Sequence, residues 1–305
     1  MTNPNSTDRD LLGYAGRPPS VMWPNGARVA VSVVVNFEEG AELQVGDGDP
    51  VSESVGEVHS VVANGARDQG QEQLFAYGMR VGLWRFLDAL RAAQLPATFL
   101  FCGQAVSRAP ENAHAAVQAG HEAACHGWRW RPHADYVSES DERNDLTRCI
   151  DAIEMATGQS PKGFFCRGSE SEFTRPLLAE LGFEYASNAF DDDLPYYDKP
   201  TGLTVVPYNL DTNDMKFFHP NGFVRASEMT EYVGDALTQL LKEGEQGKSS
   251  TLTIGYHLRI TGRPARFRAF QDVLEQIIKL EDRIWCATRL DIARHFQSVV
   301  PRSIW

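Results

Sequence analysis

Ionisable side chains directly follow apolar runs at four places in this sequence. The run from Arg28 to Phe37 ends at the adjacent acids Glu38 and Glu39, and shorter apolar runs end at His126, Arg167 and His257. Carboxylates and imidazoles are the side chains that enzymes use most often to move protons. A guanidinium can stabilise a developing oxyanion. These residue types therefore favour hydrolysis assisted by acids and histidines.

The paired acids need a special backbone to act together. Adjacent side chains on a regular strand point to opposite faces, so Glu38 and Glu39 share a pocket only if the chain turns there. Gly40 permits such a turn. One carboxylate then acts as a general base toward water, and the other orients the water or holds His126. Two solvated acids at a strand end are the alternative.

Alternating strands and helices must position these side chains. Apolar or β-branched runs predict strands over residues 28–37, 97–103, 121–127 and 250–260, and helical spacing predicts helices over 77–93, 111–120, 139–157, 229–241 and 264–280. Residues 41–69 are predicted to form a long loop. Repeated βα units indicate one parallel α/β domain, either a closed barrel or an open sheet, whose ligands bind at the carboxyl ends of the strands. We assign residues 1–25 to an extended N-terminal arm and residues 26–300 to this domain.

Composition narrows the class of protein. The 305 residues are 42% hydrophobic and 23% charged, without an apolar run long enough for a membrane span. A net charge of −12 argues against nucleic acid as a partner. Five cysteines without a Cys-x-x-Cys pair predict reduced thiols, and the N-terminus lacks a signal pattern. We expect a cytoplasmic protein. The chain has no P-loop, Gly-x-Gly-x-x-Gly turn or Gly-x-Ser-x-Gly elbow.

An ordered set of segments resembles a known superfamily. "NFEEG", "HGWRW", "GFFCRG", "DDLPYY" and "HLRITGRPAR" resemble segments of the polysaccharide deacetylase (NodB-like) superfamily, and within it the branch of cofactor-independent allantoinases and cyclic imidases. The resemblance spans about residues 23–296. It implies a single-domain deformed (β/α) barrel with its site at the strand carboxyl ends. It also implies a homo-oligomer.

The resemblance assigns roles to the first two motifs. In the deacetylases two aspartates end the first motif, the first as catalytic base and the second as metal ligand, and Glu38 and Glu39 match them. A His-x-x-x-His pair completes the metal site, but here His126 is followed by Trp130, and an indole cannot ligate a metal. Only Glu39 and His126 would remain, whereas zinc generally takes three protein ligands. We therefore predict a site without a metal, with a divalent ion such as zinc as the alternative. His133 could replace the missing ligand, but no motif singles it out.

The later motifs supply further candidates. The resemblance implies that His257 protonates the leaving nitrogen. Arg167 matches the third-motif arginine, although "CRGSESEF" departs from the allantoinase-like pattern; it either steadies the oxyanion or pairs with a strand-end acid. Trp128 and Trp130 are either walls for a flat substrate or core aromatics. Arg263 either meets an anionic group of the substrate or lies on a solvated helix face.

These assignments predict a hydrolase that opens a C–N bond in a small cyclic amide, imide or ureide. Glu38 accepts the proton of water, Arg167 or backbone donors steady the oxyanion, and His257 is the general acid. One alternative is a metal-dependent N-deacetylase of an amino sugar or polysaccharide. The other is a catalytically silent module that binds a small molecule at the barrel mouth, which the buried ionisable groups make less favourable.

Overall fold

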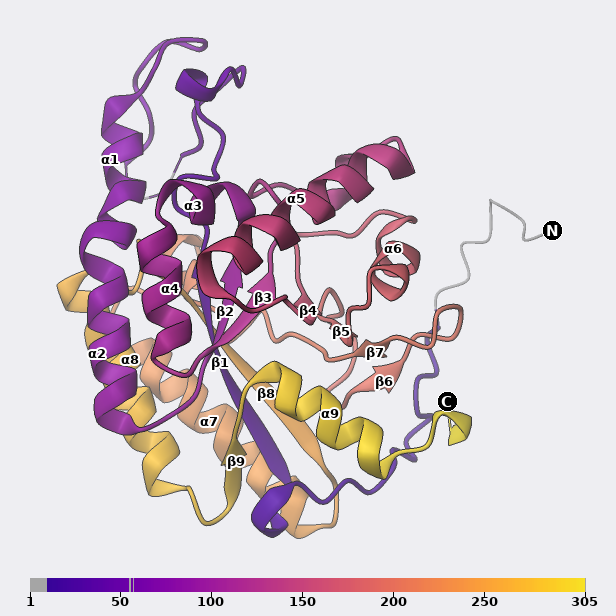
Figure 1. The fold of residues 1–305 in the computed structure, drawn as a ribbon. Coiled ribbons are helices and arrows are strands. Elements are labelled where there is room, and N and C mark those ends of the chain that lie inside the picture. Colours follow the sequence, from indigo (N-terminus) through magenta and orange to yellow (C-terminus); the bar gives the residue numbers. More distant parts are fainter. Residues whose placement is uncertain (1–9, 55, 57, 305) are drawn as a thin grey trace.

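One curled sheet lies in the middle of the molecule, and helices cover its outer face (Figure 1). The computed structural model describes residues 10–304 except residues 55 and 57. Within them the sheet has the order β6-β7-β5-β4-β3-β2-β1-β8, and β9 pairs with β1. The strands are β1 (Val29–Phe37), β2 (Thr98–Phe101), β3 (Glu122–Cys125), β4 (Gly163–Phe164), β5 (Tyr185–Ala186), β6 (Tyr196–Tyr197), β7 (Thr204–Val205), β8 (Ser250–His257) and β9 (Ile284–Cys286).

β1 pairs with three other strands, β2, β8 and β9, and its composition suits this buried position. All nine of its residues are buried, as expected for a β-branched run with neighbours on both faces. β8 pairs with it in parallel from Val29 opposite Ser250 to Asn36 opposite His257. On its other edge β9 pairs with the first three residues of β1, and β2 pairs with the last four.

The helices connect these strands. They are α1 (Gln69–Tyr77), α2 (Leu83–Ala93), α3 (Gly103–Arg108), α4 (Pro110–Gln118), α5 (Glu139–Thr157), α6 (Thr174–Glu180), α7 (Ala226–Glu245), α8 (Pro264–Lys279) and α9 (Arg289–Val299), with a π-helical turn over Gly78–Gly82 and short 3-10 turns at Pro24–Gly26, Val45–Asp47, His133–Asp135, Asp214–Phe218 and Arg302–Ile304. Ser138 caps α5 by accepting from the Asp141 N–H, and Gly158 ends it in the left-handed conformation. In the described part of the chain no helix is long and apolar enough to cross a membrane.

The predicted deformed (β/α) barrel is confirmed, because the sheet curls into a half-barrel whose pairings are parallel from β5 to β8. Among the strands of the described residues only β6 pairs antiparallel, with β7. β6, β7 and β9 were not predicted from the sequence, because each has only two or three residues and no long apolar run marks it. α9 follows the predicted helix over 264–280 and was not itself predicted.

The predicted N-terminal arm falls partly outside the described residues, which begin at residue 10. Its described portion lies against the same chain. Val21 and Trp23 are buried in a side cluster with α9, and the Trp23 indole donates to the Ser250 carbonyl at 3.1 Å. The five cysteines are all free thiols, as predicted.

Candidate active site

Parallel pairing brings three of the four predicted positions together. The carboxyl ends of β1, β3 and β8 lie at the same edge of the sheet, and Glu38, His126 and His257 stand at or just beyond those ends. All three are buried. The fourth position, Arg167, follows β4 and is partly exposed.

The turn after β1 places both acids inside the protein. The strand ends at Phe37, the Ala41 N–H donates to the Glu38 carbonyl at 2.9 Å, and Gly40 has a φ of +97°, which a residue with a side chain rarely adopts. Glu39 turns back on the chain. Its Oε1 accepts from the Arg259 N–H at 2.8 Å and its Oε2 from the Glu38 N–H at 3.3 Å.

His257 lies between two carboxylates. Its Nδ1 is 2.6 Å from Asp214 Oδ1, and its Nε2 is 2.9 Å from Glu38 Oε1. Burial alone would lower the pKa of this imidazole, but the charges of Glu38 and Asp214 outweigh burial and raise it to about 9. His257 is therefore an imidazolium at neutral pH and has a proton to donate.

Asp214 reaches His257 through a local pairing between distant segments. Asn213 forms a parallel bridge with Gly255 of β8, which sets the 3-10 turn Asp214–Phe218 beside the end of that strand. Asp214 Oδ2 then accepts from the His257 N–H at 2.8 Å and from the Thr261 hydroxyl at 2.7 Å. Each carboxylate oxygen is thus fixed, and the imidazole can take only one orientation.

His126, unlike His257, is a neutral imidazole with a lone pair available on Nε2. Its Nδ1 lies 2.5 Å from the Phe165 carbonyl, which can only accept, so Nδ1 carries the proton and Nε2 has the lone pair. Within the described residues Nε2 is buried and has no hydrogen-bond partner. Burial lowers the pKa of His126, which keeps the ring neutral. This nitrogen can accept a hydrogen bond from water or substrate.

The two acids differ in charge state. Burial opposes ionisation of Glu38, but the Arg259 guanidinium and the His257 imidazolium outweigh it and lower the pKa of Glu38 to about 2. Burial raises the pKa of Glu39 to about 7, and the neighbouring charge of Glu38 adds to that rise while Arg259 opposes it. The pair therefore holds one firm negative charge and one carboxyl that gains or loses its proton near neutral pH.

A cavity of about 440 Å³ opens in front of the two histidines. Trp130 and Phe165 supply aromatic walls, and the Asn36 and Asn213 amides supply polar ones. The turn Asp214–Phe218 closes one side with Met215, Lys216 and Phe218. Glu38 and Glu39 are not among the residues that line this cavity, but Glu38 Oε1 lies 2.9 Å from Nε2 of His257, which does line it.

Arg167 lines the cavity but is already paired. Its guanidinium contacts both oxygens of Glu53, at 2.8 and 3.1 Å, and stacks 3.8 Å from the centre of the Trp130 ring. Glu53 belongs to the long loop after β1 and not to the strand-end acids. Arg167 thus ties that loop to the cavity rim.

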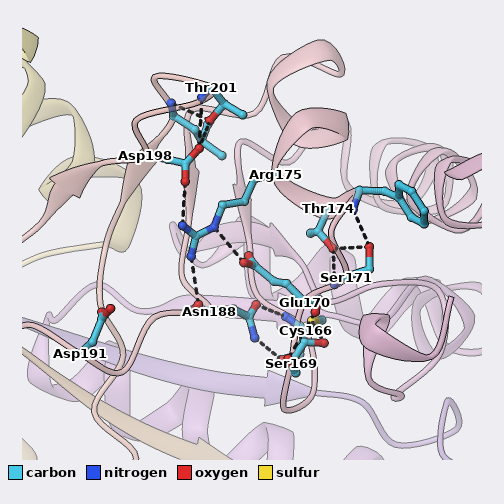
Figure 2. A network of polar contacts seen from close by, with 12 residues as sticks. Cys166, Ser169, Glu170, Ser171, Thr174, Arg175, Asn188, Asp191, Asp198 and Thr201 are labelled. Carbon is cyan, nitrogen blue, oxygen red and sulfur yellow. Dashed lines mark hydrogen bonds and ion pairs between the residues drawn. The ribbon is translucent and has the colours of Figure 1, made fainter. Parts of the chain in front are cut away.

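The loop that carries Arg167 is held by a polar network (Figure 2). Asn188 accepts from the Cys166 N–H at 2.7 Å and donates to the Cys166 carbonyl at 2.8 Å. Arg175 contacts Glu170 and Asp198, each at 2.9 Å. This anchoring fixes the loop although "CRGSESEF" departs from the family pattern.

Two predicted substrate contacts lie away from the cavity lining. Trp128 packs beneath the Arg148 guanidinium, 3.9 Å from its ring centre, and Arg263 stacks 3.7 Å from the centre of the Tyr77 ring. His133, considered as a spare ligand, lies 2.8 Å from Glu142 instead. Of the predicted aromatic walls, only Trp130 faces the cavity.

Two charged residues that contact the strand-end acids or His257 were not predicted from the sequence. Asp214 lies in a polar segment 43 residues before His257, and no sequence pattern predicts that the two are in contact. Arg259 stands inside the quoted "HLRITGRPAR" segment, two residues after His257. Its position two residues after a predicted site histidine could have indicated that Arg259 lies at the site.

The donor set does not fit the zinc ion that the deacetylase resemblance implies. Trp130 replaces one ligand, both oxygens of Glu39 accept from backbone N–H groups, and the Arg259 guanidinium lies beside the carboxylates. Across residues 10–304, apart from the two not described, no three His, Cys, Asp or Glu side chains form a group that could hold a metal. We derive no chemical step through a metal.

Comparison with known proteins defines the class. A family model described as polysaccharide deacetylase matches residues 72–186. A "putative polysaccharide deacetylase" of Schizosaccharomyces pombe is 34% identical over 96% of this chain and 98% of its own. The chain therefore belongs to the polysaccharide deacetylase family and to its hydrolase superfamily.

Two solved structures share both fold and sequence with it. A probable polysaccharide deacetylase from Pseudomonas aeruginosa PAO1 has a TM-score of 0.89 and 38% identity, covering 96% of this chain and 99% of the other. Puue allantoinase has a TM-score of 0.90 and 38% identity, covering 99% of both chains. Two structures that resemble this chain equally closely are thus named after two different activities, deacetylase and allantoinase.

Proposed function

We propose that this protein hydrolyses a C–N bond in a small cyclic amide, imide or ureide. The observation that carries the proposal is the position of His257, held between the carboxylates of Glu38 and Asp214 at the wall of the cavity. Ring opening of an amide must place a proton on a poor leaving group, the nitrogen. A fixed imidazolium beside a carboxylate supplies this proton.

The cavity supports a small, flat substrate. Its volume of about 440 Å³ suits one ring and an attacking water. Trp130 and Phe165 offer aromatic surface, and the Asn36 and Asn213 amides offer donors and acceptors for a ring that carries both C=O and N–H. The likeness to an allantoinase, whose name refers to such a ring, supports the same substrate class.

Each step of the proposed reaction uses residues described above. In this proposal a water molecule enters from the cavity beside His257, on the side where Glu38 lies, and attacks the ring carbonyl while Glu38 takes one of its protons. Glu38 Oε2 has no hydrogen-bond partner within the described residues, so it has a lone pair for that proton once the water lies against it. The carbonyl oxygen becomes an oxyanion, which Arg167 meets after exchanging Glu53 for substrate. The C–N bond then breaks as His257 protonates the nitrogen.

The second candidate is an N-deacetylase of an amino sugar. The observation that favours it is family membership, together with the names of the S. pombe and P. aeruginosa relatives. Its chemistry is also hydrolysis of an amide C–N bond, but the products are acetate and a free amine.

Turnover of a substrate panel distinguishes the two. Succinimide, maleimide, hydantoin, allantoin and an N-acetylated chito-oligomer would be assayed before and after exhaustive chelation, with metal content measured on the same samples. We expect ring opening that survives chelation. Acetate release from the oligomer, or ring opening that disappears on chelation and returns with added metal, would overturn the proposal.

A further inference from the structure

Arg259 occupies an unusual position for an arginine. Its side chain is 2% exposed, and its Nη1 lies 3.3 Å from Glu38 Oε1 and 3.5 Å from Glu39 Oε1. The guanidinium is also 4.6 Å from the centre of the Phe75 ring and 4.7 Å from that of Trp130. A full positive charge is therefore buried between two acids and two aromatic faces.

The contacts of this guanidinium are those of a point charge. An arginine that serves as a structural clamp usually forms two parallel hydrogen bonds with one carboxylate. Here Nε and Nη1 have no hydrogen-bond partner within the described residues, and Nη1 is shared between the two acids at longer distances. The guanidinium therefore stabilises the negative charge of both acids electrostatically and forms no bidentate hydrogen-bonded pair with either of them.

We infer that Arg259 takes the place of the metal ion of the deacetylases, as a built-in cation between Glu38 and Glu39, and that Trp130 holds it there. Trp130 stands where the deacetylases have their second histidine, and its ring face attracts a guanidinium. Tryptophan in place of histidine at position 130 thus removes a metal ligand and adds an aromatic face against which the Arg259 guanidinium packs. This assignment does not depend on which amide the protein hydrolyses.

Charge balance in the site supports the inference. The positive charges of His257 and Arg259 oppose the carboxylates of Glu38 and Asp214, all four buried. Without Arg259 the pair Glu38–Glu39 would lack its only close guanidinium among the described residues. A divalent cation placed between these acids would meet the guanidinium at a few ångströms and be repelled.

Zinc binding by two variants tests this. Trp130→His restores the missing histidine and keeps Arg259, whereas the double variant Trp130→His/Arg259→Ala also removes the guanidinium. Zinc affinity and stoichiometry would be measured on chelator-stripped protein by calorimetry and elemental analysis, without any substrate. We expect the double variant to bind one zinc per chain at least tenfold more tightly than Trp130→His. Equal affinity, whether both bind or neither does, would overturn the inference.

A second measurement uses the guanidinium ion as a probe. In Arg259→Ala, 20 mM guanidinium chloride is expected to raise the melting temperature relative to 20 mM sodium chloride, because it refills the cavity. The wild type and Arg80→Ala, which lacks an exposed arginine, should show no rise. Absence of a rise in Arg259→Ala would contradict the inference. If no variant lacking Arg259 folds, Trp130→His alone decides: one bound zinc per chain in this variant overturns the assignment, and no bound zinc supports it.

Discussion

Asp214→Asn tests whether the charge on His257 drives the reaction. Asp214 accepts three hydrogen bonds, from Nδ1 and the N–H of His257 and from the Thr261 hydroxyl. An asparagine has nearly the same shape but only one oxygen. Whichever way its amide is turned, its NH₂ group faces one of these donors. The substitution removes one negative charge and disturbs the orientation of the imidazole.

The size of the effect follows from the pKa of His257. Between its ordinary value of 6.5 and about 9, the difference corresponds to about 3 kcal/mol in favour of the imidazolium. Glu38 and Asp214 are both major causes, so the loss of one should bring the pKa most of the way back toward 6.5. At pH 8 the variant would then be mainly neutral at His257. Loss of a general acid costs about 10²–10⁴-fold in rate, so we expect kcat to fall by about 10²-fold.

The assay is the pH dependence of kcat/KM, combined with NMR titration of the His257 ring. In the wild type the rate should hold until the pH approaches about 9, and in Asp214→Asn it should decline from near neutral pH. Asp211→Asn, the same change at an exposed position nearby, is the matched control and should behave as wild type. An unchanged alkaline limb together with an unchanged His257 titration in Asp214→Asn would refute this reasoning.

Three further predictions follow from the same contacts. Glu38→Gln should lower turnover by about 10²–10⁴-fold in a folded protein, measured by steady-state kinetics. His257 has a folded-state pKa above its unfolded value, so its contribution to stability is complete below about pH 6.5 and lost as the pH rises through about 9; calorimetry should show this loss in the wild type and a flatter profile in His257→Gln. Gly78→Ala would place a Cβ within 2.6 Å of Glu39 Oε1, and should cost about 1–3 kcal/mol in urea unfolding.

Each of these has a result that would count against it. Wild-type turnover in both Glu38→Gln and His257→Ala would remove them from the mechanism. Identical stability profiles of wild type and His257→Gln between pH 6 and 10 would mean that the imidazole is not charged in the folded state. Gly46→Ala, whose new Cβ would meet no atom within 3.6 Å, is the control for Gly78→Ala and should be nearly neutral.

Much of the site was readable from local pattern. The β-branched run before Glu38 predicts a strand buried on both faces, and parallel strands bring their carboxyl ends to one edge. Glu38, His126 and His257 therefore met as expected, and the turn at Gly40 buried both acids. The order of the motifs indicated the superfamily, which the comparisons confirm.

Tertiary structure decided what each of these groups can do. Asp214 meets His257 only because Asn213 pairs with Gly255, a contact between segments whose spacing has no period. Arg167 pairs with Glu53 from a loop without a regular pattern.

Charge states are likewise a property of the assembled site. The adjacent acids Glu38 and Glu39 are both desolvated and both lie beside Arg259, but their pKa values differ because Glu38 also faces the positive charge of His257, whereas Glu39 faces the negative charge of Glu38. Sequence order determines which residues stand at the strand ends, because strand pattern is local. Partner identity, desolvation and charge depend on distances of a few ångströms between remote segments, and only the folded chain sets those distances.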